Sequence, residues 1–365
     1  MSALFTPIRV AEVEFANRIV VSPMCQYSAH DGCAGDWHGT HLGMLANSGA
    51  GLLVFEASAV ERRGRISHGD LGLYDDDCEA ALAGVVAHCR RIGTAKLGIQ
   101  LAHAGRKASA QRPWEGGRPL SRAEDPWQTI APSAVPFGAD WHTPVAMTRA
   151  DLERVRDAHA QAARRAVRVG FDALEVHGAH GYLLHEFFSP ISNRRTDEYG
   201  GSLAGRMRFP LEVMEAVRAV WPKNRPLGMR ITGCDWIEGG VEVADAVAFA
   251  RELKRRGVDF VCVSSGGISP DAKITIAPNY QVPFAEAVRR EAGLPTRAVG
   301  LIARARQAEA IVAQEKADMV ALARAFLDNP HWAWAAARVL EADVARPPQY
   351  HRASARVWPA AFESD

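Results

Sequence analysis

Short apolar runs alternate with longer amphipathic stretches along almost the whole chain. The runs are continuously apolar rather than alternating in polarity, which is typical of parallel strands covered on both faces. Eight such runs are separated by helical patterns. Eight strand–helix units in one chain predict an α/β fold of the (β/α)8 TIM-barrel type. The predicted strands span residues 18–24, 52–60, 96–103, 172–177, 227–233, 259–266, 296–300 and 318–324.

The stretch from Thr148 to Gly170 shows the helical pattern most clearly. Apolar residues recur there at intervals of three and four, which places them on one face of a helix. Thr148 with Asp151 fits an N-cap pair, and Gly170 fits the C-terminal position that favours glycine. The next strand is predicted to begin within two residues, so the connection from helix to strand is tight.

The segment at 104–147 breaks this rhythm, because it is rich in Trp, Pro and Gly. It follows the third predicted strand and therefore belongs to the C-terminal face of the barrel, where long loops commonly cover an active site. Its three tryptophans would be costly to leave in water, so we expect a capping insertion. The chain as a whole, 1–365, is predicted to be a single domain with a C-terminal extension at 341–365.

The composition limits the classes of function. The chain has 365 residues, 48% of them apolar, and a net charge of +1 from 43 basic and 42 acidic side chains. This balance lacks the basic excess that is typical of nucleic-acid binding and of anionic lipid surfaces. No apolar run reaches the roughly 18 residues of a membrane span, and the N-terminus has no signal-peptide pattern. We therefore expect a cytoplasmic protein that binds neither nucleic acid nor membrane.

Six cysteines are scattered along the chain, and no two of them form a C-x-x-C pair. That spacing argues against a zinc ribbon and against an iron–sulfur cluster. Five of the six are expected to be buried small hydrophobic residues. The sixth, Cys25, is set apart because it directly follows the first predicted strand.

Polar rings gather where the fourth predicted strand ends, in EVHGAHGYLLHEFFSP. Chemistry in a TIM barrel lies at strand ends, so His177, His180 and Tyr182 are candidate site residues. Three interpretations compete: a metal site, an acid–base site, or two structural histidines held by neighbouring backbone. Histidine metal ligands are usually accompanied by carboxylates, but Glu56 and Glu175 lie inside strands rather than at their ends. The sequence therefore disfavours a metal and leaves the other two interpretations open.

Glycine follows the sixth and seventh predicted strands, and Ala323-Arg324 follows the eighth. TIM barrels often hold a phosphate at this point through backbone N–H groups, to which an arginine adds charge-assisted hydrogen bonds. The chain has neither a G-x-G-x-x-G after a strand nor a Walker motif, so a dinucleotide held in a Rossmann fold is not indicated.

Five strings of residues resemble the old yellow enzyme family of FMN-dependent ene-reductases, in the bacterial branch of xenobiotic reductases and thermophilic-like enzymes. The match runs in order over essentially the whole chain, which makes it far more specific than a lone short pattern. It implies a TIM barrel that binds FMN at its C-terminal face and takes hydride from NADPH. The matching strings are NRIVVSPMCQYS (17–28), QLAHAGRKAS (100–109), EVHGAHGYLLHEFFSPISNRRTDEYGGS (175–202), AVGLI (298–302) and QYHR (349–352).

Carried over to this sequence, the resemblance implies the residues of a flavin site. Gln100 is expected to hydrogen-bond the pyrimidine edge of the flavin, and Arg230 to face N1 and the C2 carbonyl. Cys25 is interpreted as a tuner of the flavin potential rather than as a nucleophile. Ala323 stands where relatives usually have glycine, which backbone binding of a phosphate tolerates if φ is negative. The expected cofactor-binding residues are Ser22, Pro23, Met24, Cys25, Ala57, Gln100, Arg230, Gly300, Ala323 and Arg324.

The resemblance also implies a reaction, the ping-pong reduction of the C=C bond of α,β-unsaturated carbonyl compounds. His177 and His180 are expected to bind the carbonyl oxygen while hydride passes from flavin N5 to the β-carbon. One donor aimed at such a developing oxyanion is typically worth about 10²–10³ in rate. Tyr182 is expected to protonate the α-carbon, since a phenol with a pKa near ~10 carries its proton at neutral pH. Two alternatives stay open: a metal-dependent barrel hydrolase that uses the histidine pair, and a flavin-binding protein without catalysis.

Three further residues are assigned to substrate binding. Tyr27 is expected to line the substrate pocket. Arg352 and Trp358 are expected to border a pocket of their own or of a neighbouring subunit, as the corresponding arginine does in this branch; the alternative for Arg352 is a surface position. The expected partners are a small-molecule enone or related electrophile and further copies of the chain, in a homodimer or homotetramer.

Overall fold

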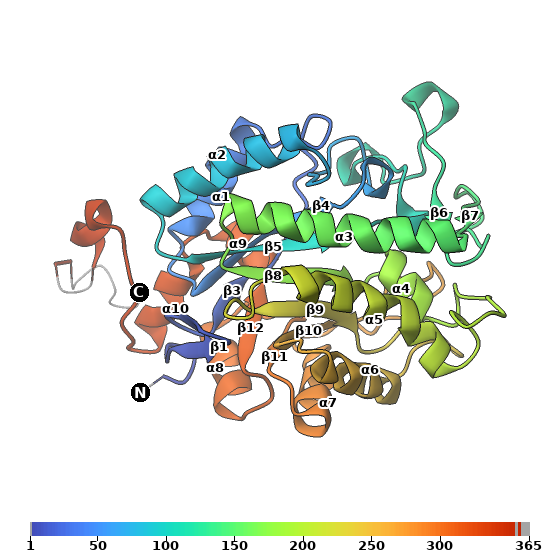
Figure 1. Ribbon diagram of the computed structural model, residues 1–365. Helices are drawn as coiled ribbons and strands as arrows, with labels where there is room; N and C mark the ends of the chain where they lie inside the picture. The colour runs from blue at the N-terminus through green and yellow to red at the C-terminus, as the bar shows by residue number, and fades with distance from the viewer. Residues whose placement is uncertain (1, 355–356, 359–365) are drawn as a thin grey trace.

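Eight parallel strands close into a barrel in the computed structural model, which describes residues 2–354, 357 and 358 (Figure 1). The last strand, β12, pairs with the first, β3, and completes the ring. The predicted TIM barrel is therefore confirmed, although several strands end earlier than expected because the chain leaves the barrel there to form loops. The barrel strands are β3 (Ile19–Val21), β4 (Leu52–Ala59), β5 (Lys96–Ala102), β8 (Ala173–Gly178), β9 (Leu227–Thr232), β10 (Phe260–Ser264), β11 (Thr296–Ala298) and β12 (Met319–Leu322).

Helices cover the outside of the barrel, with α3 and α5 packed side by side (Figure 1). The helix predicted between Thr148 and Gly170 is confirmed as α3: the Thr148 hydroxyl accepts from the Asp151 N–H, and Gly170 ends the helix with a φ of 96°. None of the helices in the described part of the chain is long and apolar enough to cross a membrane. The helices are α1 (Asp36–Ala46), α2 (Asp76–Ile92), α3 (Arg149–Val169), α4 (Leu183–Phe188), α5 (Leu203–Val220), α6 (Val243–Arg255), α7 (Val282–Ala292), α8 (Ala305–Ala313), α9 (Arg324–Asp328) and α10 (Trp332–Val339).

A hairpin packs against the N-terminal end of the barrel, and the apolar pattern of the sequence did not predict it. Its strands, β1 (Ile8–Val10) and β2 (Val13–Phe15), pair in antiparallel fashion. The side chains of Val10 and Phe15 are buried in one apolar cluster with inward-facing residues of the barrel strands. Burying one such side chain contributes roughly 1.5–3 kcal/mol. This end of the barrel is a packed core.

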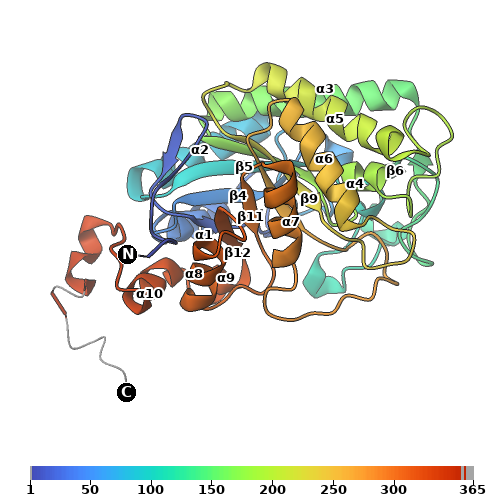
Figure 2. The same ribbon diagram turned by 90° about the horizontal axis from the view of Figure 1, so that it is seen from below.

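The segment after β5 extends from the barrel on the side away from the two termini (Figure 2). It contains the 3-10 turn η2 (Gly105–Lys107), two further 3-10 turns and the short strands β6 (Ile130–Ala131) and β7 (Val145–Ala146). Arg106, which is buried, joins the segment to the loop after β10 by donating to the Ile268 carbonyl at 2.6 Å. This contact holds the segment over the ends of the barrel strands.

One expectation about this segment was wrong. Trp114 is 65% exposed, so the expectation that the three tryptophans are kept out of water does not hold for it. It lies in the turn η3 (Pro113–Glu115), and its ring contacts the Tyr27 ring edge-on at a centroid distance of 5.8 Å. The indole therefore has this aromatic contact, while much of the ring faces solvent.

Candidate active site

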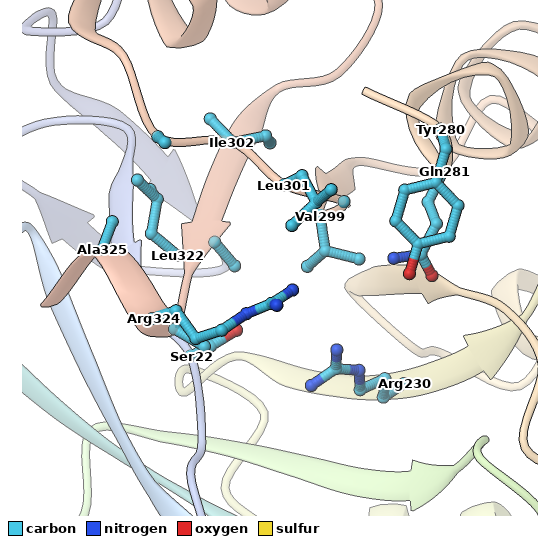
Figure 3. Close-up of a pocket in the computed structure, with 14 residues that line it drawn as sticks. Ser22, Arg230, Tyr280, Gln281, Val299, Leu301, Ile302, Leu322, Arg324 and Ala325 are labelled. Carbon is cyan, nitrogen blue, oxygen red and sulfur yellow. The ribbon is translucent and has the colours of Figure 1, made fainter. Parts of the chain in front are cut away.

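A cavity of about 220 Å³ opens at the C-terminal ends of the barrel strands (Figure 3). Ser22, Arg230, Gly300, Ala323 and Arg324 all line it. The structure therefore brings together residues that the sequence placed at the ends of four different strands. The guanidinium groups of Arg230 and Arg324 both point into this space, as Figure 3 shows. The cavity is consequently a site of positive charge.

The backbone around this cavity has the conformations that a phosphate site needs. Gly300 has a φ of 115°, and a Cβ atom at that position would lie 2.9 Å from the Gln281 nitrogen. Only glycine fits there without strain. Ala323 has a φ of −108°, so the condition under which backbone binding of a phosphate would tolerate alanine is met. Both residues can present backbone to the cavity without a bulky side chain in the way.

Two imidazoles converge at the end of β8. Nε2 of His177 and Nδ1 of His180 lie 3.3 Å apart, and the rings are nearly perpendicular, at 89°. The Ala179 N–H donates to Nδ1 of His177 at 3.3 Å, so the proton of that neutral ring sits on Nε2. The structure thus brings the two predicted histidines together, with Nε2 of His177 within hydrogen-bond distance of Nδ1 of His180.

The second ring nitrogen of His180 enters a chain of hydrogen bonds. Nε2 lies 2.7 Å from Oγ of Ser264, whose hydroxyl donates to Oε1 of Gln281 at 2.9 Å. A hydroxyl both donates and accepts, so its rotation decides which nitrogen of His180 carries the proton. Sequence reasoning missed both partners: Ser264 falls within the predicted strand 259–266, and Gln281 lies in a stretch without a periodic pattern.

The turn that carries His180 is conformationally unusual. His180 has a φ of 60°, in the left-handed region, and Gly181 follows with a φ of 75°. A Cβ atom on Gly181 would lie 2.0 Å from the Gly267 oxygen, so the two loops touch through their backbones. Nζ of Lys107 donates to the carbonyls of His180 and Gly267 at 2.8 and 3.1 Å. Lys107 therefore fixes this turn, a role that sequence reasoning did not assign to it.

The electrostatics of the site keep its rings in neutral forms. Burial, with a smaller contribution from the Arg230 charge, lowers the pKa of both His177 and His180 well below the usual value. Tyr182 immediately precedes α4, and its ring lies 5.1 Å from the His177 ring. Burial raises the pKa of Tyr182 well above its usual value. At pH 7 the site therefore offers two neutral imidazoles and a protonated phenol.

The segment after β3 forms a further part of the site. The Gln26 N–H donates to Oε2 of Glu56, which is buried in β4, at 2.8 Å, and Tyr27 follows with a φ of 51°. Burial, followed by the charges of Asp70 and Glu56, raises the pKa of the Cys25 thiol well above its usual value. A thiol in that state is a poor nucleophile, which agrees with the interpretation of Cys25 as a non-nucleophilic residue.

The remaining candidates for flavin binding lie on neighbouring strands. Pro23 and Met24 are half-buried just beyond β3, and Ala57 follows an irregularity in the pairing of β4 with β5. Gln100 is 2% exposed in β5, and its Nε2 donates to Oε1 of Glu175 at 2.7 Å. These residues belong to adjacent strands of one barrel.

The two C-terminal candidates lie elsewhere. The extension packs on α10 through Tyr350, whose ring is edge-on to Trp334, on the side of the molecule away from β6 (Figure 2). Arg352 is exposed and Trp358 is 57% exposed. The structure of one chain does not bring these residues to the histidine pair. A contribution to a neighbouring subunit remains the prediction for both.

The histidine pair would give a metal ion two ligands at most. Among the described residues, no group of three or more His, Cys, Asp or Glu side chains could hold a metal ion. His177 and His180 alone fall short of the three protein ligands that catalytic zinc sites use.

Comparison with known proteins agrees with the geometry. A family model described as the NADH:flavin oxidoreductase / NADH oxidase family matches residues 3–343. The NADPH dehydrogenase of Geobacillus thermodenitrificans is 46% identical over 353 residues, which cover 96% of this chain and 98% of that protein. The NADPH dehydrogenase of Listeria innocua is 42% identical over 355 residues, which cover 97% and 99%.

Solved structures give the same result. Morphinone reductase in complex with tetrahydroNAD has a TM-score of 0.78 at 29% identity, covering 96% of this chain and 94% of that one. The old yellow enzyme homologue of Zymomonas mobilis has a TM-score of 0.78 at 24% identity, covering 94% of each chain, a similarity that supports the fold alone. The metal-dependent hydrolase and the non-catalytic flavin protein are thereby set aside. The chain belongs to the NADH:flavin oxidoreductase / NADH oxidase family, and it is an FMN-dependent NADPH oxidoreductase of the old yellow enzyme type.

Proposed function

We propose that this oxidoreductase reduces the C=C bond of α,β-unsaturated carbonyl compounds. One observation carries the proposal: Nε2 of His177 and Nδ1 of His180 lie 3.3 Å apart beside the phenol of Tyr182, whose ring lies 5.1 Å from the His177 ring. Two nitrogens at this spacing can both reach one carbonyl oxygen. The phenol next to them can supply a proton to a neighbouring carbon. Enone reduction needs both functions at once.

The residues around the cavity fit FMN. Two arginines point into it, and Nε of Arg230 is buried without a hydrogen-bond partner among the described residues, so its positive charge lacks a full set of acceptors. An anionic phosphate and an electron-rich flavin edge would supply them. We assign Gly300, Ala323 and Arg324 to the phosphate, and Arg230 to N1 and the C2 carbonyl. Ser22, Pro23, Met24, Cys25, Ala57 and Gln100 are assigned to the flavin ring.

The histidines act on the substrate oxygen in this proposal. FMN, when held here, would supply hydride chemistry, with NADPH as the source of the hydride and the β-carbon of the enone as its acceptor. His177 donates from Nε2, since its Nδ1 is occupied by the Ala179 N–H. His180 donates from Nδ1 when the Ser264 hydroxyl turns to donate to its Nε2, 2.7 Å away. Each donor stabilises the negative charge that develops on the oxygen, and the loss of one such donor typically costs about 10²–10³ in rate.

Tyr182 completes the reaction by protonating the α-carbon. Its pKa is raised well above the usual value by desolvation, so the phenol stays protonated and available as an acid throughout the physiological range. Tyr27 is proposed to line the pocket on the side of Trp114, whose ring it touches.

Anaerobic reduction of the FMN-loaded enzyme tests this function. NADPH is expected to bleach the yellow absorbance, and 2-cyclohexenone is expected to restore it with one equivalent of saturated ketone formed. A saturated analogue, cyclohexanone, is the matched control and should leave the flavin reduced. Flavin that NADPH reduces but that enones, maleimides and other activated alkenes all fail to reoxidise would contradict the proposal.

A further inference from the structure

A buried ion pair crosses the interior of the barrel. Glu175 on β8 and Arg297 on β11 are 2% and 1% exposed, and Nη1 of Arg297 lies 3.3 Å from Oε2 of Glu175. The Arg297 guanidinium also stacks on the Phe260 ring at 3.7 Å. Much of the surrounding barrel interior is apolar. Two charges in such a place are costly to desolvate, and an apolar pair of similar volume often serves stability equally well.

The geometry of the pair also argues against a role in stability alone. Nε and Nη2 of Arg297 are buried without hydrogen-bond partners among the described residues. Unsatisfied buried donors carry a desolvation cost. A buried ion pair with such unsatisfied donors is better explained by its effect on a neighbouring group than by a contribution to stability.

That neighbour is Gln100. It is the direct register partner of Glu175 across β5 and β8, and its Nε2 donates to Oε1 of Glu175 at 2.7 Å. An arginine can only donate, so Oε2 of Glu175 accepts from Arg297, while Oε1 accepts from the amide. The Gln100 amide is therefore held with its NH2 group toward Glu175. Its Oε1 atom and its second N–H remain for another partner.

We propose that Glu175, paired with Arg297, is a positioning residue that sets the orientation of the Gln100 amide for the pyrimidine edge of FMN. The inference rests on the placement of that edge at Gln100 under the proposed function. The pyrimidine edge has one N–H donor, N3, flanked by carbonyl acceptors. Oε1 and the remaining N–H of Gln100 are complementary to this arrangement. The reversed amide would set its NH2 group against the N3 hydrogen.

The test compares the affinities of FMN and of N3-methyl-FMN, which lacks the N3 hydrogen. Wild-type apoprotein should prefer FMN. In E175Q the new amide can donate or accept, so Gln100 is no longer held in one orientation, and the preference should fall about fivefold, as expected for one hydrogen bond between neutral groups. The double variant E175Q/R297M removes both charges and should lose the preference equally. It also covers the case in which E175Q alone leaves an unpaired Arg297 and fails to fold.

The midpoint potential gives an independent readout. E175Q removes a negative charge near the flavin site, so the potential should rise, since the reduced flavin is the more electron-rich form. E175Q/R297M removes one charge of each sign and should return the potential toward the wild-type value. A purely structural role would weaken binding of both flavins alike and would not produce this order of potentials.

Controls separate the inference from its premises. D259N removes an arginine-paired carboxylate at the other end of the barrel, where Asp259 accepts from Arg218 at 3.2 Å, and should leave both readouts unchanged. The ratio of FMN to riboflavin affinity reports the phosphate end and should stay constant in every variant. If E175Q and the double variant both keep the wild-type preference for FMN, the positioning role is wrong. If Q100L also keeps it, the placement of the pyrimidine edge is wrong. None of these measurements uses an enone, so a failure of the proposed reaction shows itself separately.

Discussion

Two regions of the molecule hold histidines whose pKa is lowered mainly by burial, and they use them differently. On the helix α3, His159 is 0% exposed, and its Nδ1 lies 2.8 Å from the Val155 carbonyl one turn earlier. At the end of β8, Nε2 of His177 and Nδ1 of His180 lie 3.3 Å from each other. Burial is the main cause that lowers the pKa in both regions, to about 4 for His159. Burial and neutrality therefore do not distinguish a catalytic imidazole from a structural one.

The difference lies in which groups the ring nitrogens contact. The bond of His159 stays within its own helix and serves the packing of α3. The bonds of His177 and His180 involve a left-handed turn, the Ala179 N–H and Ser264, and they leave a pair of nitrogens facing each other. A ligand atom can bind beside two nitrogens that lie together on a strained turn.

The largest expected effect comes from Tyr182→Phe, which removes the proposed acid and keeps the ring. The oxidative half-reaction with 2-cyclohexenone should slow by about 10²–10⁴, the usual worth of general acid catalysis. Reduction of FMN by NADPH should keep its wild-type rate in stopped-flow measurements. Equal slowing of both half-reactions would show that Tyr182 has a structural role instead.

His180→Ala should come next, because it removes one of the two donors on the oxygen. Enone reduction is expected to fall by about 10²–10³ while FMN stays bound. The charge-transfer band that a para-substituted phenol produces with the flavin should weaken in parallel. An undiminished band would refute the assignment of His180 to the substrate oxygen.

His159→Gln is the matched control, because it changes a histidine to which we assign a structural role. The folded state keeps His159 neutral down to about pH 4, whereas the unfolded chain protonates near the usual pKa of 6.5. Protonation of His159 in the unfolded chain therefore favours unfolding as the pH falls from 6.5 toward 4, whereas above pH 6.5 this destabilisation is absent. The loss of stability amounts to roughly 2 kcal/mol at pH 5. The variant should lose less stability than the wild type between pH 7.5 and 5 in urea unfolding. Its rate of enone turnover should stay within about twofold of the wild-type rate. A large kinetic defect would contradict the distinction between this structural histidine and the pair at the end of β8.

Cys25→Ala should have the smallest effect. Removal of a weak S–H contact disfavours the electron-rich reduced flavin, so the midpoint potential should fall by about 30 mV or less, equivalent to ~1.4 kcal/mol for two electrons. FMN should remain bound, and enone reduction should continue. Loss of all turnover would contradict the interpretation of Cys25 as a tuner.

The barrel could be predicted from the sequence because parallel strands buried on both faces leave continuous apolar runs. The hairpin of β1 and β2 could not, because each strand has three residues and only Val10 and Phe15 mark its buried side. Histidines and tyrosine at the end of β8 were visible as an unusual cluster. Lys107 and Gln281 reach the site from segments far away along the chain, and no local pattern encodes such contacts.

The most direct test of the central claim is a crystal structure of the FMN-loaded enzyme with 4-hydroxybenzaldehyde bound. We expect the phenolic oxygen within about 3.2 Å of both Nε2 of His177 and Nδ1 of His180, with the aromatic ring stacked on the flavin. An oxygen that contacts only one imidazole or neither, or a metal ion between the two rings, would contradict the account.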